Sequence, residues 1–202
     1  DKIARLAAAQ SPARACVLTL PDSIAWLLNI RGSDIARNPV PHAFAILHKD
    51  ARVDLFLAPR KLAEAGDILS PAVTVHAPDA LTGVLASLEG PVQIDPDTCP
   101  VAIARALGDR LVEGPDPCLL PKACKTAAEI DGARAAHLRD GAAMVRFLAW
   151  LDAQEPGSLT EIDVVSRLEE ERRASNQLRD ISFETIAGSG PNGAIVHYRV
   201  SQ

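Results

Sequence analysis

Aromatic residues are scarce in this chain of 202 residues, at 3% of the total. Hydrophobic residues still make up 48% and charged residues 23%, which is the balance of a globular protein rather than a disordered one. The core must therefore be built mostly from leucine, isoleucine, valine and alanine. Because domains commonly run to roughly 100–200 residues, the length allows one large domain or two small ones.

A surplus of positive charge and long apolar runs are also missing. The formal net charge is -5, whereas a nucleic-acid partner requires clustered Lys and Arg. No uninterrupted apolar run approaches the ~20 residues that span a bilayer, and no basic-then-apolar leader is present. We therefore expect a soluble, cytoplasmic protein with no nucleic-acid or membrane partner.

Closely spaced cysteine pairs are absent. The four cysteines, Cys16, Cys99, Cys118 and Cys124, form no C-x-x-C, and zinc ribbons or fingers need two close pairs or a Cys pair with a His pair. The sequence leaves a disulfide between Cys118 and Cys124 as an open alternative. Reduced, partly buried thiols are the better prediction for a cytosolic protein.

Strand-like and helix-like segments alternate through residues 1–121. The expected strands are 16–20, 43–47, 53–57, 73–75, 92–94 and 111–112, and the expected helices are 1–9, 24–28, 60–65, 79–88 and 101–107. The polar residues 48–52 between two apolar runs indicate a hairpin. This alternation predicts an α/β domain with helices packed on a mixed sheet.

The proline-rich stretch 114–121 breaks the pattern and predicts a boundary between domains 1–121 and 122–202. After it, Thr126 and Glu129 have the spacing of a capping box, which begins the longest helix. The predicted inward face of that helix comprises Ile130, Ala133, His137, Gly141, Met144, Leu148 and Leu151. Thr160 to Asp163 repeats the start signal, and residues 169–173 are predicted to be a solvated charged face with pairs one turn apart.

The segment 182–198, SFETIAGSGPNGAIVHY, reads as an apolar strand, a glycine-rich loop and a second apolar run that carries His197. Apolar strands need neighbouring strands to cover them. Because residue 1 is not Met, and because this segment lacks predicted partners, we expect the sequence to be a fragment.

The glycine-rich loop formally matches G-x-G-x-x-G, with Gly188, Gly190 and Gly193. A dinucleotide site needs a helix to begin at the third glycine, but here Pro191 lies inside the motif and the chain continues as an apolar, extended run. No Lys-Ser or Lys-Thr follows, so a P-loop is also excluded. A tight hairpin connection with positive φ at Asn192 and Gly193 is the plainer alternative.

Few side chains suggest chemistry by spacing alone. His197 is a candidate, although a single histidine on an apolar strand is more often structural than catalytic. His137 and Asp140 lie one helical turn apart, but two ligands do not make a metal site. Ser189 has no base that spacing identifies, and no G-x-S-x-G is present, which disfavours a serine hydrolase.

Two long motifs carry a family resemblance. Residues 22–34, DSIAWLLNIRGSD, followed by NPV at 38–40, resemble the second, creatinase-like domain of three-domain aminopeptidase P. Residues 182–198 resemble the start of that family's catalytic pita-bread domain. The resemblance implies a creatinase-like α/β domain over 1–121 and, over 122–202, a pita-bread (α+β) domain that is truncated before its metal ligands.

The resemblance also implies a function. Enzymes of this family remove the N-terminal residue from peptides with proline at the second position, and they use two divalent ions, commonly manganese. His197 matches the histidine beside the metals that hydrogen-bonds the substrate or the developing tetrahedral centre. The five metal ligands of the family lie downstream, so the chain alone is expected to hold no metal pair and to be inactive. A homodimer, as is common in the family, stays open.

Two alternatives accompany this interpretation. The chain could be a non-catalytic interaction module that retains the creatinase-like domain. It could instead be a prolidase or creatinase relative, but such a relative would lack the stretch 29–34 in this form.

Overall fold

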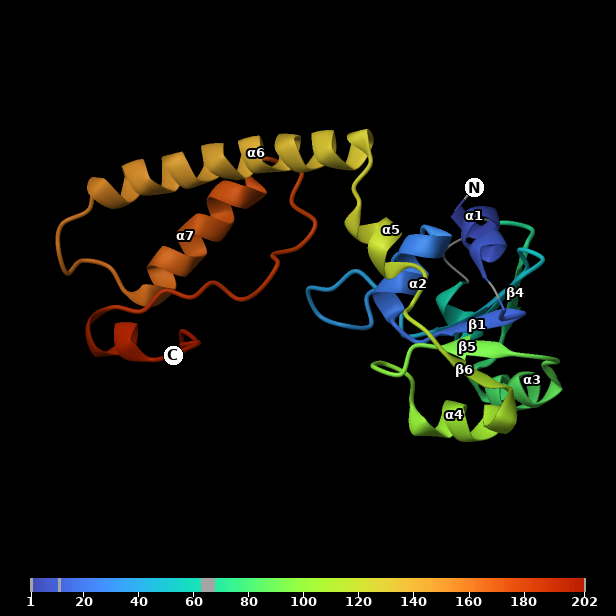
Figure 1. The fold of residues 1–202 in the computed structure, drawn as a ribbon. Coiled ribbons are helices and arrows are strands. Elements are labelled where there is room, and N and C mark those ends of the chain that lie inside the picture. Colours follow the sequence, from blue (N-terminus) through green and yellow to red (C-terminus); the bar gives the residue numbers. More distant parts are fainter. Residues whose placement is uncertain (1, 11, 63–67, 202) are drawn as a thin grey trace. The chain divides into compact units, whose positions relative to one another are not determined.

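The computed structural model describes residues 2–10, 12–62 and 68–201. The chain divides into two compact units, 1–124 and 125–202, each of which is described by itself (Figure 1). The boundary predicted between residues 121 and 122 stays a prediction of domain organisation. The observed division between the compact units falls shortly after it.

A six-stranded mixed sheet forms the centre of the first unit, in the order β4-β3-β2-β1-β5-β6. Its strands are β1 (Ala15–Leu18), β2 (Phe44–His48), β3 (Val53–Phe56), β4 (Val73–His76), β5 (Val92–Ile94) and β6 (Leu111–Glu113). The pairs β1–β2 and β2–β3 are antiparallel and the others are parallel. The predicted strands and the hairpin are confirmed, with small differences at their ends.

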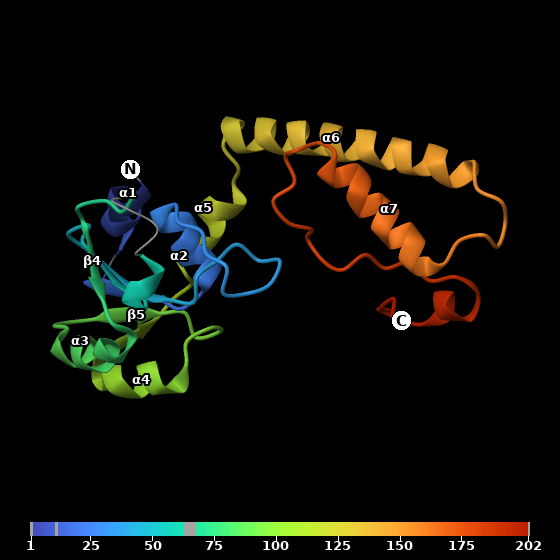
Figure 2. The same cartoon turned by 180° about the vertical axis from the view of Figure 1, so that it is seen from behind.

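Helices cover both faces of this sheet (Figure 2). The helices α1 (Lys2–Ala9), α2 (Pro21–Leu28) and α5 (Leu119–Ala123) lie on one side, and α3 (Leu81–Ser87) and α4 (Val101–Leu107) lie on the other. Successive strand residues point to opposite faces, so Val53 and Leu55 join the core beneath α1 and α2 while Phe56 joins the core beneath α3 and α4. Both cores are rich in aliphatic side chains, as the composition predicts.

Short 3₁₀ helices connect several of these elements: η1 (Pro59–Lys61), η2 (Pro78–Ala80) and η3 (Gly108–Arg110). The helix expected over 60–65 is only a 3₁₀ turn in its described part, which begins at Pro59 and ends at Lys61. The remainder of that prediction, residues 63–65, lies outside the described residues.

Arg110 joins the ends of α3 and α4. Its guanidinium donates hydrogen bonds of 2.6–3.2 Å to the backbone carbonyl oxygens of Leu85, Ala86, Leu88, Ala106 and Leu107. The last carbonyls of a helix have no partner within the helix. One side chain thus satisfies acceptors at the C-terminal ends of two neighbouring helices.

The second unit contains two packed helices, α6 (Ala127–Asp152) and α7 (Glu161–Arg173) (Figure 1). Both predicted capping boxes are present, with Thr126 and Glu129 at the start of α6 and Thr160 and Asp163 at the start of α7. The hydroxyl and the carboxylate each satisfy a backbone N–H that the helix leaves free.

The predicted inward face of α6 is wrong in this unit. Its buried residues are Ala143 and Phe147, whereas Ile130 and Leu148 are exposed. The reason is that α7 packs on another face of α6, where Ala143 and Phe147 are buried and Asp140 and Arg146 pair with side chains of α7.

The charged run 169–173 is only partly a solvated face. Glu169 and Arg173 pair one turn apart at 2.6 Å, as predicted. Glu171, however, is buried and accepts hydrogen bonds from Arg146 Nε at 2.8 Å and Arg167 Nη2 at 2.6 Å. A buried carboxylate needs such partners, and the bond from Arg146 also connects α7 to α6.

The strands predicted within 182–198 are also wrong. Between residues 174 and 201 the structure has no strand, and the regular element present is the 3₁₀ helix η4 (Gly190–Ala194). An extended segment is stable only when neighbouring strands take its backbone hydrogen bonds. The described part of the second unit supplies no neighbouring strand, and the glycine-rich loop forms the 3₁₀ helix η4 instead.

Candidate active-site segment

The first of the two motifs forms the loop between α2 and β2. Asn29 ends α2 in the left-handed conformation, with φ of 56°, and its N–H bonds the carbonyl oxygen of Ala25. A Cβ atom on Gly32 would lie only 2.6 Å from the backbone nitrogen of Pro41, so any side chain there would collide with backbone. The glycine of the motif is thus required for the close approach of two loop strands.

Asp34 completes this loop. Its carboxylate accepts hydrogen bonds from Lys61 Nζ and from the backbone N–H of His42, the latter at 2.6 Å. The bonds from Lys61 and His42 hold the pKa of Asp34 below its usual range. Asn29, Gly32 and Asp34 of the motif therefore have structural roles in the shape of the loop.

The second motif is held by Glu161, the first residue of α7. One carboxylate oxygen accepts from the backbone N–H of Ser189 at 2.6 Å, and the other accepts from the Tyr198 hydroxyl at 2.6 Å. Asn192 Nδ2 lies 3.1 Å from both oxygens and 2.9 Å from the Tyr198 hydroxyl oxygen. We call Glu161, Ser189, Asn192 and Tyr198 the loop anchor.

The protonation of the loop anchor follows from these contacts. The bond from Tyr198, followed by that from Ser189, lowers the pKa of Glu161. The same bond to Glu161 raises the pKa of the Tyr198 hydroxyl. At neutral pH the anchor is therefore an ionised carboxylate bound to a protonated phenol.

The structure places His197 directly beside this anchor in sequence, with an exposed side chain and a φ of 53°. A left-handed conformation costs a residue with a Cβ roughly 1–2 kcal/mol. Ile195 and Val196 just before it are also exposed, at 53% and 83%. Sequence reasoning found His197 but missed Glu161, which it took only as part of a helix start signal.

A cavity of about 340 Å³ adjoins the loop anchor on the α7 side. Its walls come from the connection between α6 and α7 and from the glycine-rich loop, and its lining includes Leu151, Leu159, Glu161, Val164 and Gly188. Apolar and polar residues share this lining, which contains two glutamates, Glu155 and Glu161.

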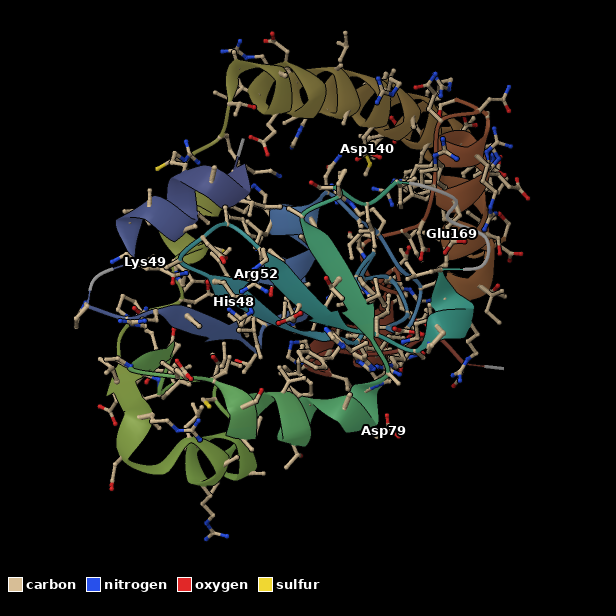
Figure 3. All side chains as sticks on the ribbon, turned by 90° about the vertical axis from the view of Figure 1, so that its right-hand side faces the viewer. His48, Lys49, Arg52, Asp79, Asp140 and Glu169 are labelled. Atoms are coloured by element: carbon tan, nitrogen blue, oxygen red, sulfur yellow. The ribbon has the colours of Figure 1, made fainter. Side chains whose placement is uncertain are left out.

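The other candidates in this unit are engaged elsewhere. His137 Nδ1 donates to the carbonyl oxygen of Ala133 at 2.8 Å, and Asp140 accepts from Arg172 Nε at 2.7 Å (Figure 3 labels Asp140). Across residues 2–10, 12–62 and 68–201, no group of three or more His, Cys, Asp or Glu side chains is arranged to hold a metal ion. The described residues thus do not fit a metal pair, and no step is assigned to one.

A cluster of ionisable residues that the sequence did not reveal lies on the sheet of the first unit. Asp54 of β3 accepts from His48 Nε2 at 2.7 Å and from His76 Nε2 at 2.8 Å (Figure 3 labels His48). Burial raises the pKa of Asp54, but the bonds from His76 and His48 outweigh it, so this pKa lies below its usual value. The cluster therefore joins β2, β3 and β4, which are neighbours in the sheet.

All four cysteines are free thiols, as predicted. Burial, followed by the nearby Asp116, raises the pKa of both Cys16 and Cys118. Reactive cysteines need a lowered pKa and exposure, so these two are structural. No helix in the described part of the chain is long and apolar enough to span a membrane.

Comparisons with known protein families show to which family the chain belongs. Residues 1–129 match the Creatinase/Prolidase N-terminal domain, and residues 131–202 match metallopeptidase family M24. The chain belongs to the creatinase/prolidase N-terminal domain family. Together with the match of residues 131–202 to the metallopeptidase family, this confirms the resemblance found in the two motifs.

Individual relatives point the same way. The chain is 38% identical to a probable Xaa-Pro aminopeptidase P of Laccaria bicolor, over 98% of this chain and 33% of that protein. It is 32% identical to aminopeptidase P1 of Arabidopsis thaliana, over 94% of this chain and 37% of that protein. It thus spans about a third of the length of these relatives.

A solved structure supports the fold. The X-prolyl aminopeptidase of Caenorhabditis elegans, described as a cytosolic enzyme with a di-nuclear active site, superimposes with a TM-score of 0.89 at 28% identity. The match covers 98% of this chain and 34% of that one. The predicted fold class, a creatinase-like α/β domain with a mixed sheet followed by part of a pita-bread domain, is confirmed.

Proposed function

We propose that this chain is part of a metallo-aminopeptidase that removes the N-terminal residue from peptides with proline at the second position. The observation that carries the proposal is the similarity over 98% of the chain to a probable Xaa-Pro aminopeptidase P and, at a TM-score of 0.89, to an X-prolyl aminopeptidase. In this proposal residues 1–121 are the second, creatinase-like domain and residues 122–202 begin the catalytic domain.

The substrate class explains why a dedicated enzyme is needed. The bond before proline is a tertiary amide without an N–H, and proline restricts the residue before it. Sites that hold an extended backbone by its N–H groups therefore bind such peptides poorly. The proposed site has to recognise the free N-terminus and the carbonyl oxygen instead.

Within this chain, His197 is the proposed catalytic residue. Its imidazole would donate a hydrogen bond to the substrate carbonyl oxygen or to the tetrahedral centre that develops from it. Such a donor accelerates the reaction only if it stabilises the transition state more than the ground state. Its exposed position beside the loop anchor is compatible with contact to a peptide.

The remaining assignments follow the family. Two divalent ions, with manganese the expected metal, would be bound by residues outside those described here, so that this chain alone is inactive. The complete enzyme would act on peptides in the cytoplasm, and a homodimer stays open for it.

The test is peptide hydrolysis by the complete protein that contains this chain. With added manganese, it should cleave Arg-Pro-Pro after the arginine and leave Arg-Ala-Pro much less affected. Replacing His197→Ala should lower kcat by about 10²- to 10³-fold, as for the loss of one transition-state donor. His137→Ala, which removes another exposed histidine of the same unit, should leave kcat unchanged.

Two results would contradict the proposal. A complete protein that cleaves no proline peptide with any divalent metal would favour the non-catalytic interaction module. A variant His197→Ala with unchanged kcat would remove the assigned role of that histidine while leaving the activity in place.

A further inference from the structure

We infer that Glu161 is a positioning residue for His197, because its carboxylate fixes the chain on both sides of that histidine. The inference deepens the proposed function and rests on it, since His197 is there the residue that contacts the substrate. Glu161 itself contacts no reacting atom in this assignment.

The residues that bind Glu161 lie on both sides of His197 in the sequence. Ser189 and Asn192 precede the histidine and Tyr198 follows it directly, and all three donate hydrogen bonds to the same carboxylate. The two bonds of 2.6 Å, from Ser189 and Tyr198, have the short length of charge-assisted hydrogen bonds. The carboxylate therefore ties both ends of the segment to the start of α7.

The hydrogen bonds within the loop anchor are complete. The Tyr198 hydroxyl donates to Glu161 and accepts from Asn192 Nδ2, whose second hydrogen faces the carboxylate oxygens. Satisfied networks of this kind specify one arrangement of their members. Losing the carboxylate would leave three donors without their shared acceptor.

Helix capping does not account for Glu161. A carboxylate in the first turn of a helix is favoured by the helix dipole in general. At this helix, however, Thr160 and Asp163 already form the complete capping box. The Glu161 carboxylate is turned toward the glycine-rich loop instead, across 28 to 37 positions of sequence.

The backbone conformation of His197 is one that the loop anchor can stabilise. A φ of 53° is unfavourable for a residue with a Cβ, so the chain relaxes from it unless its neighbours are fixed. Without Glu161, Tyr198 loses its acceptor and the imidazole leaves its position. Because misplacement of a catalytic group by about 1 Å can cost on the order of 10²-fold in rate, the reaction should sense this change.

The experiment compares variants of the complete, metal-loaded protein on Arg-Pro-Pro. Glu161→Ala should lower kcat by about 10- to 100-fold with a smaller change in KM, because the substrate is still bound but its donor is misplaced. Glu161→Gln keeps one acceptor oxygen and should retain more of kcat. Tyr198→Phe removes a single hydroxyl and should have a milder effect of the same kind. The matched control is Glu169→Gln, since the hydrogen bond of Glu169 runs to Arg173 within α7 (Figure 3 labels Glu169).

A double-mutant cycle separates positioning from other roles. If Glu161 acts through His197, Glu161→Ala should cost little further kcat in a His197→Ala background. An equal loss in both backgrounds overturns the inference, as does an unchanged kcat in Glu161→Ala while His197→Ala is impaired. If His197→Ala is itself unimpaired, the proposed role of the histidine fails first.

A readout without turnover completes the test. In protein labelled at histidine nitrogen, the His197 imidazole resonances, assigned by their loss in His197→Ala, should shift in Glu161→Ala and stay unchanged in Glu169→Gln. Unshifted resonances in a folded Glu161→Ala protein overturn the inference, whether or not the enzyme cleaves proline peptides.

Discussion

Asp54 shows how a single carboxylate can organise three strands. It lies between two imidazoles, His48 on β2 and His76 on β4, with side chains that are 13–27% exposed. The ring of His76 also stacks on Phe56, with 5.1 Å between the ring centroids. The two hydrogen bonds to Asp54 stabilise the sheet, because a partly buried carboxylate without donors would destabilise it.

Replacing Asp54→Asn should lower the free energy of unfolding by about 1–2 kcal/mol at pH 7, since two imidazoles lose an ionised acceptor. The folded pKa of Asp54 lies below its usual 3.8, so the stabilisation is complete above that value and is lost as the pH falls through the lower, folded pKa. Denaturation of both proteins between pH 7 and pH 3 should therefore show a difference that shrinks in the acid range.

The control for this change is Asp50→Asn. Asp50 pairs with Arg52 at the surface, where both side chains are more than half exposed. Exposed pairs stabilise little, so the effect at pH 7 should be much smaller. An Asp54→Asn difference that stays constant to pH 3 would contradict the assigned role of the carboxylate.

At the scale of elements, the sheet of the first unit needs its covering helices fixed at their ends. Arg110 does this for α3 and α4 by donating to carbonyl groups of both. A guanidinium suits the task because its planar fork presents five donors in fixed directions, whereas the lysine ammonium is a single point on a flexible stem.

Arg110→Lys should therefore destabilise the first unit by about 1–3 kcal/mol although the charge is kept. The measurement is the midpoint of urea unfolding with an unchanged slope. Arg105→Lys, on the exposed side of α4, is the matched control and should leave the midpoint in place. Equal effects of the two substitutions would show that the fork geometry of Arg110 is unimportant.

Elements set by local patterns could be predicted from the sequence, and elements set by distant partners could not. The alternation around Val53 and the Thr126 start signal act within a few residues, and both were predicted correctly. The buried stripe of α6 depends on where α7 lies against it, which spacing within α6 does not state. The contact between Glu161 and Tyr198 joins residues 37 positions apart, so no local pattern could reveal it.

At the scale of the whole molecule, the two units differ in how well they bury their apolar side chains. The first unit has two aliphatic cores on opposite faces of a sheet. In the second, Leu138 and Val145 on α6 are 78% and 67% exposed, and Val196 is 83% exposed. Leu138 and Val145 are seven residues apart and therefore share one face of α6, and apolar faces of this kind are commonly covered by another segment or molecule.

The chain by itself should bind a hydrophobic dye and associate as its concentration rises. Leu138→Glu combined with Val145→Glu should lower dye fluorescence and shift sedimentation toward the monomer, because it removes apolar area and adds charge. Ala142→Glu adds a charge to an exposed position of the same helix without removing a large apolar side chain, and it should change both quantities less. A wild-type chain that stays monomeric without dye binding would refute this expectation.

The sheet order also constrains the sequence of folding events. Its first strand in the chain is a central strand, in which Ala15 pairs with His48 on one side and with Val92 on the other. The hairpin of β2 and β3 closes a short loop, whereas the β1–β5 pairing closes a long one and carries the larger entropy cost. During synthesis, β1 can pair with β2 once residues 44–48 have left the ribosome, but its other edge stays open to other strands until β5, at residues 92–94, follows.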